Sequence, residues 1–143
     1  MKLLAYEVDK RSFLGVLNED ETWVYPVSAA GMEYRSMKDL IREAGPSEME
    51  MLDYISKKAP GDVMGAAPVD EIRVVSPIAE PDQDIICLGI NYMDHAKESA
   101  RFKKEEFSKP EKAIYFSKRV NRTNDPDGII PAHKNLTNQL DYE

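Results

Sequence analysis

The sequence contains a single cysteine, Cys87, and no long uninterrupted apolar run. One cysteine cannot form an internal disulfide, which fits a reducing compartment. The N-terminal apolar stretch is soon interrupted by Glu7 and Asp9, so we expect neither a secretory signal nor a membrane span. We therefore predict a cytoplasmic protein in which Cys87 packs as a small apolar side chain.

Positive charge is also in short supply. The chain has 19 Lys and Arg against 26 Asp and Glu, a formal net charge of -7, which argues against binding to nucleic acid or to an anionic membrane. It has no glycine loop of the kind that cradles phosphate, no Cys/His zinc spacing and no serine-centred nucleophile elbow. Small molecules or other proteins remain as the expected partners.

What the sequence does contain is enough apolar material for a core, since 42% of its 143 residues are hydrophobic. Residues 2–8, 12–17 and 22–27 predict three short strands of an antiparallel meander. Two helices should follow. Ser36 is the expected N-cap of the first and Gly45 its C-terminal stop. Ser47 is the expected N-cap of the second, with Glu50 in the capping-box position.

The pattern changes near residue 70, where we place a domain boundary. Residues 1–70 are expected to form an N-terminal accessory α+β domain, and residues 71–143 an incomplete second domain, so the predicted fold class is α+β. Further strands are predicted over residues 71–78, 85–90, 112–118, 129–131 and 138–143. The strand over 85–90 reads as fully buried, and a helix is expected from Asn91.

His95 and Glu98 are the first candidates for chemistry. Three positions apart, they would share one face of a helix, where the carboxylate could orient the imidazole and raise its basicity. The pair directly follows a predicted strand and Gly89, and ligand sites commonly form at such junctions. A general base and a solvated surface pair, the commoner case, both remain open.

Three other positions have competing interpretations. Lys118 ends a predicted strand and is either a solvated charge or a partner for an anionic substrate. His133 follows Pro131 in a polar segment and is expected to be solvated. Glu143 ends the chain, and one carboxylate makes no magnesium site because a hard cation needs several oxygen ligands.

Four blocks of sequence follow one another along the second half of the chain: CLGINYMDHAKE, KPEKAIYFSK, DGIIPAH and NQLDYE. Together they resemble the fumarylacetoacetate hydrolase family, and the three-strand N-terminal portion is similar to the accessory domain of many bacterial members. The resemblance implies a metal-dependent hydrolase or isomerase with a rolled, mostly β catalytic domain. Its substrates would be small 2-oxo or 1,3-dicarbonyl acids, of the acylpyruvate or hydroxymuconate type, and some members decarboxylate related compounds.

The resemblance also assigns roles by motif position. His95 and Glu98 match the family's His/Glu dyad, Lys118 its Phe-x-Lys segment, and Glu143 the first glutamate of its Glu-x-Glu metal pair. It implies that Mg²⁺ or Mn²⁺ acts as a Lewis acid on the substrate, and that His95, held by Glu98, takes a proton from water. Lys118 would then oppose a carboxylate or an oxyanion.

The departure from the family pattern is that the sequence reaches only Glu143 of the metal motif. We therefore expect it to be the front of a longer protein, unable alone to bind the metal tightly or turn over substrate. The alternative is a non-catalytic oligomerisation or regulatory module derived from the same fold. Strands over 113–118 and 138–143 would expose sheet edges, so we expect a homo-oligomer, namely a dimer.

Overall fold

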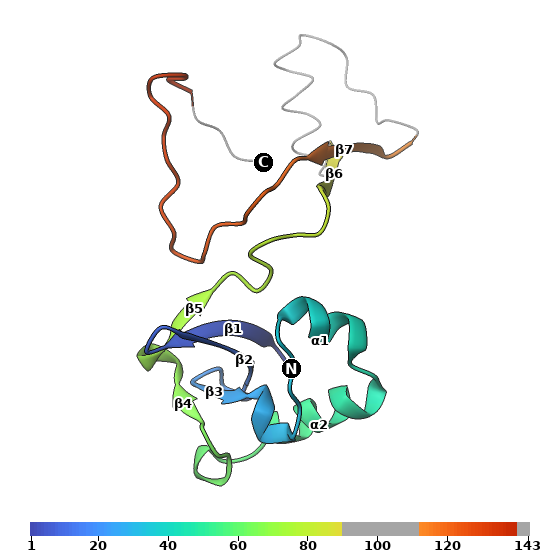
Figure 1. The fold of residues 1–143 in the computed structure, drawn as a ribbon, viewed down its shortest axis with the longest axis vertical. Coiled ribbons are helices and arrows are strands. Elements are labelled where there is room, and N and C mark those ends of the chain that lie inside the picture. The colour runs from blue at the N-terminus through green and yellow to red at the C-terminus, as the bar shows by residue number, and fades with distance from the viewer. Residues whose placement is uncertain (90–111, 140–143) are drawn as a thin grey trace. The chain divides into compact units, whose positions relative to one another are not determined.

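The computed structural model describes residues 1–89 and 112–139 (Figure 1). The chain divides into two units. The first consists of residues Met1–Ala79 together with Thr123–Glu143, and the second of Glu80–Arg122. The predicted α+β class is confirmed. The proposed assignment of 1–70 and 71–143 to separate domains stays a prediction.

The first unit is built on a five-stranded antiparallel sheet that curls into a half-barrel. In chain order its strands are β1 (Leu3–Val8), β2 (Arg11–Leu17), β3 (Trp23–Pro26), β4 (Ala67–Pro68) and β5 (Arg73–Val75). Their order across the sheet is β4-β3-β2-β1-β5. The three predicted N-terminal strands are thus confirmed, and β5 adds to the free side of β1 with Ala5 opposite Val75.

A two-residue turn joins β1 to β2. Val8 is opposite Arg11, and between them Asp9 and Lys10 have φ of 49° and 64°. Positive φ at both central residues is the type I′ arrangement, whose twist matches that of the flanking strands. Asp tolerates this conformation better than Lys does, because its short polar side chain can hydrogen-bond locally. The turn therefore holds one poorly suited residue.

Two short helices follow the sheet's first three strands: α1 (Met37–Glu43) and α2 (Pro46–Ser56). The predicted N-cap of α1 is confirmed, since Ser36 Oγ accepts a hydrogen bond from the Asp39 N–H at 3.2 Å. Neither α-helix within the described ranges is long and apolar enough to cross a membrane. Single 3-10 turns, η1 (Val27–Ala30), η2 (Pro60–Asp62) and η3 (Val69–Glu71), complete the connections.

The junction between α1 and α2 differs from the prediction. Gly45 follows α1 but is extended, with φ of -88° and ψ of -177°, so it does not end that helix by a left-handed turn. It is instead the N-cap of α2, and its N–H donates to Glu48 Oε2 at 3.1 Å. The predicted capping pair of Ser47 and Glu50 is therefore wrong. Pro46 starts the helix because its fixed φ suits the first helical position and its missing N–H costs nothing there.

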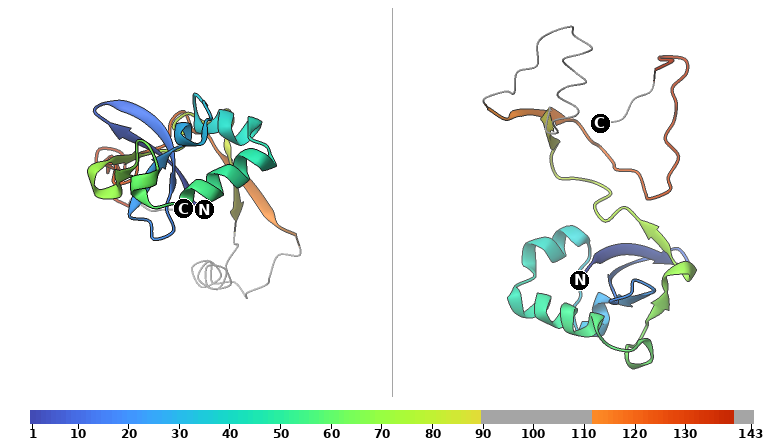
Figure 2. Two further views of the ribbon diagram at one scale, coloured as in Figure 1. Left: turned by 90° about the horizontal axis from the view of Figure 1, so that it is seen from below. Right: turned by 180° about the vertical axis from the view of Figure 1, so that it is seen from behind.

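The main core lies between the sheet and the two helices, which cover the same face in both views of Figure 2. Its buried members are Val16, Tyr25, Val27, Met37, Leu40, Leu52, Ile55 and Val63. Tyr25 is fully buried and its hydroxyl donates to the Lys58 carbonyl at 2.8 Å. Each large apolar side chain removed from water here stabilises the unit by roughly 1.5–3 kcal/mol.

A second apolar cluster occupies the opposite face of the curled sheet and centres on Leu4, Tyr6 and Val24. Gly15 of β2 makes this packing possible. A Cβ at Gly15 would lie 2.8 Å from Tyr6 Cε1 and closer still to Val24 Cγ2. The absence of a side chain on β2 therefore lets Tyr6 and Val24 approach each other across it.

The second unit contains one antiparallel pair, β6 (Ile85–Gly89) and β7 (Ile114–Lys118). Both strands were predicted. The prediction that the first is fully buried is wrong, since Ile86 is 73% exposed. Apolar side chains alternate onto both faces of this two-stranded ribbon, and one partner strand cannot cover them.

Two further predicted strands are not formed where the structure describes them. Residues 129–131 are irregular, and Ile129 and Ile130 are exposed, because no neighbouring strand in the described chain pairs with them. Residues 138–139 are likewise not in a strand. The rest of that predicted strand, and the helix expected from Asn91, lie outside the described residues.

Candidate functional site

The β6–β7 ribbon carries the part of the candidate site that the structure describes. In its register Gly89 is opposite Ile114, and Ile85 is opposite Lys118. The chain that bears His95 and Glu98 therefore leaves the ribbon at the Gly89–Ile114 end. Lys118 is at the other end, four residues away, or about 13 Å at about 3.3 Å per residue.

Lys118 lies against its own strand. Its side chain is half-buried, and its Nζ is 5.9 Å from the centre of the Phe116 ring. Residues two apart in a strand share a face, so Phe116 and Lys118 lie on one side of β7, and Tyr115 and Ser117 on the other. A cation over an aromatic ring gains roughly 0.5–1 kcal/mol at an exposed position.

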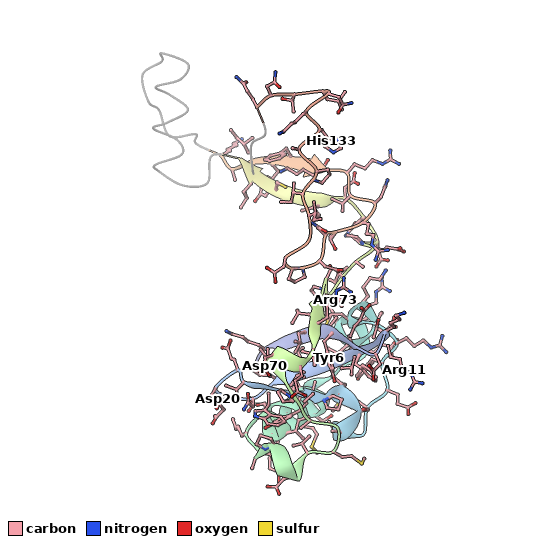
Figure 3. All side chains as sticks on the ribbon, turned by 90° about the vertical axis from the view of Figure 1, so that its left-hand side faces the viewer. Tyr6, Arg11, Asp20, Asp70, Arg73 and His133 are labelled. Carbon is pink, nitrogen blue, oxygen red and sulfur yellow. The ribbon has the colours of Figure 1, made fainter. Side chains whose placement is uncertain are left out.

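The remaining predicted site residues, His95, Glu98 and Glu143, lie outside the described residues, so their roles stay predictions. His133 is described, and it is exposed on an irregular segment (Figure 3). Its φ is 44°, and its carbonyl accepts hydrogen bonds from the N–H groups of Leu136 and Thr137. His133 is therefore solvated, as predicted from the sequence.

Within residues 1–89 and 112–139, no three His, Cys, Asp or Glu side chains come together in a way that could hold a metal ion. The described residues therefore do not form the expected Mg²⁺ or Mn²⁺ site. Glu143, the predicted ligand, is not among them.

Cys87 was expected to be packed away from solvent. It is half-buried instead, and its Sγ is 3.9 Å from the Ile85 carbonyl oxygen. Phe116 is directly opposite it in the register, so the thiol shares a face with Phe116 and Lys118. Its partial exposure has the same cause as that of Ile86, namely a ribbon with a single pair of strands.

A cluster that the sequence did not point to lies in the first unit, around Arg73 of β5 (Figure 3). Arg73 Nη1 donates to Glu7 Oε2 and Nη2 donates to Asp125 Oδ2, both at 2.6 Å. Asp125 Oδ1 also accepts from the Ser76 N–H at 2.9 Å. The one available signal was the Asp-Pro-Asp-Gly run at 125–128, which is typical of a turn but says nothing of a partner 52 residues away.

A shallow hollow of about 630 Å³ runs beside this cluster. Its lining comes from η3 and β5 on one side and from the returning chain on the other: Val69, Ile72, Arg73, Val74, Asn124, Asp125, Pro126, Asp127 and Gly128. Two carboxylates flank the Arg73 guanidinium, so its charge is compensated. The hollow is thus poorly suited to holding an anionic acid.

Two tyrosine hydroxyls have clearly perturbed acidity, and both belong to the apolar clusters of the first unit. Burial raises the pKa of Tyr6. Burial, and then the carboxylates of Asp20 and Asp62, raise the pKa of Tyr25. These raised pKa values result first from burial in the core, and neither tyrosine belongs to the candidate site.

No family model matches the chain. It is, however, distantly homologous along its whole length to longer bacterial proteins, and it spans about half the length of these relatives.

One of the relatives is oxaloacetate tautomerase YisK of Bacillus subtilis, to which the chain is 29% identical over 153 residues, covering 100% of this chain and 49% of YisK. An uncharacterised protein of Staphylococcus epidermidis is 27% identical over 154 residues, with 48% of its length covered. Another, from Staphylococcus aureus, is 26% identical over 153 residues, with 49% covered.

Proposed function

We propose that these residues are the N-terminal part of a fumarylacetoacetate hydrolase family enzyme acting on a small 2-oxo or 1,3-dicarbonyl acid. The observation that carries the proposal is the whole-length alignment with an oxaloacetate tautomerase. The four ordered sequence blocks between residues 87 and 143, which lie within that alignment, resemble the same family. Tautomerisation of a 2-oxo diacid is the reaction that we expect first.

Tautomerisation of a 2-oxo acid requires one well-placed general base. Tautomerisation moves a proton between the carbon next to a ketone and the ketone oxygen, and no carbon–carbon bond is broken. A histidine oriented by a carboxylate titrates near neutral pH and can both take and return that proton. In the proposed enzyme His95 does this, and Glu98 holds its imidazole. In a hydrolase the same base would take a proton from water.

Lys118 is proposed to oppose a substrate carboxylate or the developing enolate oxygen. The ribbon register constrains this role, because Lys118 and the point where the His95 segment begins are about 13 Å apart. A four-carbon acid is shorter than that. For Lys118 and His95 to contact one substrate, the lysine side chain would have to span part of this distance.

The metal is also part of the proposal. Mg²⁺ or Mn²⁺ would supply Lewis-acid polarisation of the substrate oxygens when bound. Glu143 is the ligand proposed from this chain, and other oxygen ligands are needed because a hard cation takes about six. A homodimer remains the proposed assembly.

The test uses the protein that carries residues 1–143, with oxaloacetate and Mg²⁺, and follows the enol by its ultraviolet absorbance. The variant His95→Ala should lower kcat by roughly 10²–10⁴-fold, the usual contribution of a positioned general base. The matched control His133→Ala changes an exposed turn residue and should leave kcat unaltered. Full turnover by His95→Ala would overturn the role of His95.

The alternative function is a non-catalytic oligomerisation module. The apolar ribbon favours it, since Ile86, Leu88 and Tyr115 are all exposed and such patches are common in protein interfaces. A panel of 2-oxo and 1,3-dicarbonyl acids separates the two. Absence of turnover on every member, combined with a concentration-dependent sedimentation coefficient, would favour the module.

A further inference from the structure

The chain leaves the first unit after Ala79 and returns to it at Thr123, and hydrogen bonds join these two points. The Thr123 N–H donates to the Ala79 carbonyl at 2.8 Å, and the Thr123 hydroxyl donates to the Ile78 carbonyl at 2.9 Å. The hydroxyls of Ser76 and Thr123 are also in hydrogen-bond contact. Residues 80–122 therefore start and finish at the same place on the first unit.

Asp125 extends this connection to the sheet. Its two carboxylate oxygens accept from different groups of β5 and the residue after it: Oδ2 from the Arg73 guanidinium and Oδ1 from the Ser76 N–H. Arg73 is itself opposite Glu7 of β1 in the register and donates to it. A carboxylate that accepts from a guanidinium and a backbone N–H makes two charge-assisted bonds, which are stronger than neutral ones.

This set of residues, Arg73, Ser76, Thr123 and Asp125, is here called the stem. Ser76 is buried, and Thr123 and Asp125 are half-buried. The described chain that follows contrasts with it. Residues 129–139 are exposed, and Thr137 and Gln139 among them hydrogen-bond to each other, two positions apart in sequence. The interactions that fix the returning chain are thus concentrated at Thr123 and Asp125.

We propose that Thr123 and Asp125 are positioning residues, which hold the two ends of residues 80–122 together on the N-terminal sheet. This segment bears His95, Glu98 and Lys118, so the positioning role rests on the proposed function. Fixing both ends of a segment reduces the conformations open to it, and misplacing a reacting group by about 1 Å can cost about a hundredfold in rate. The stem would affect turnover without touching the substrate.

The first measurement is amide hydrogen exchange in the 143-residue chain, which needs no activity. The N–H groups of Ser76 and Thr123 should be protected. Thr123→Val removes the hydroxyl but keeps the N–H, and exchange at Thr123 should become about tenfold faster, the effect of losing a bond of ordinary strength. Thr123→Ser should restore protection, and Thr137→Val, which alters an exposed hydroxyl outside the stem, should leave it unaltered.

The second measurement is turnover of oxaloacetate by the protein that carries these residues. Thr123→Val and Asp125→Ala should lower kcat about tenfold or more with little change in KM, and Thr123→Ser should restore kcat. A merely stabilising stem would leave kcat of the folded variants unaltered. Equal kcat in all variants would therefore overturn the positioning role.

The two measurements separate the possible failures. Exchange at Thr123 and Ser76 as fast as at Ile129 and Ile130 would overturn the stem itself. No turnover by the unaltered protein would overturn the proposed function and the positioning role with it. In that case the exchange data would still decide whether the hydrogen bonds of the stem form in solution.

Discussion

The two units use the same backbone arrangement but differ in what covers their side chains. Both contain antiparallel strands in regular register. In the first unit, helices and a curled sheet enclose the apolar residues, and Leu52 is 0% exposed. In the second, Leu88 of β6 is 48% exposed. The contrast teaches that the stability and the candidate chemistry of this chain lie in different places.

The largest expected effect tests this contrast directly. Leu52→Ala should lower the free energy of unfolding by about 2–5 kcal/mol, because it removes buried contacts and leaves a cavity. Leu88→Ala makes the same chemical change on the ribbon and should cost less than about 0.5 kcal/mol. Urea unfolding of the 143-residue chain, followed by circular dichroism, measures both. A similar cost for the two variants would contradict the contrast, since Leu88 would then be covered in solution.

A smaller effect concerns pH and the buried hydroxyl of Tyr25. The pKa of Tyr25 is raised in the folded chain, first by burial and then by Asp20 and Asp62. A folded pKa above the unfolded value of about 10 stabilises the fold below about pH 10, and this contribution is lost as the pH rises through the folded pKa.

Tyr25→Phe should therefore behave differently in two ranges of pH. Near pH 7 it should cost about 0.5–1.5 kcal/mol, because the hydrogen bond to the Lys58 carbonyl is lost. Above pH 10 the stability difference from the unaltered chain should shrink. Tyr6, whose pKa is also raised, remains in both proteins and keeps part of the alkaline dependence. Parallel loss of stability from pH 8 to 11 would exclude a raised pKa at Tyr25.

The smallest effect sharpens the comparison at the β1–β2 turn. Lys10→Gly creates Asp-Gly, a preferred sequence for a type I′ turn, and should raise the stability of the first unit by about 0.5–1 kcal/mol. Lys10→Ala keeps an L side chain at positive φ and should give no such gain. Thermal unfolding of the two variants side by side is sufficient. If both variants gained stability, the cause would be the loss of the lysine charge and not the relief of backbone strain at positive φ.

Much of the first unit could be predicted from sequence because its signals are local. The alternation in residues 2–27 marks strands that pair with their neighbours in sequence, and Ser36 caps its own helix. The predicted start of α2 was wrong because two neighbouring residue pairs could each form the helix cap. Gly45 and Glu48 form the cap, two residues earlier than Ser47 and Glu50, because Pro46 fixes the first helical turn.

The misses in the rest of the chain come from long-range effects. Whether β6 is buried depends on what packs against it, and its own apolar run cannot reveal that. The pairing of Arg73 with Asp125 joins residues 52 apart, and no periodicity in the sequence connects them. His95 and Glu98 were candidates from their spacing, and the resemblance assigned roles to them and to Glu143. All three lie outside the described residues.

The joined passages at Ala79 and Thr123 also have a consequence for how such a chain can change over evolution. The cost of closing a flexible loop rises slowly with its length, by about 0.6 kcal/mol for each doubling. Residues 80–122 could therefore lengthen, shorten or be exchanged with little effect on the sheet that carries them. The Thr123 N–H already donates a hydrogen bond to the Ala79 carbonyl, so the two ends of the segment lie side by side. Replacing residues 80–122 while keeping Ala79 and Thr123 would give the same half-barrel a different insert.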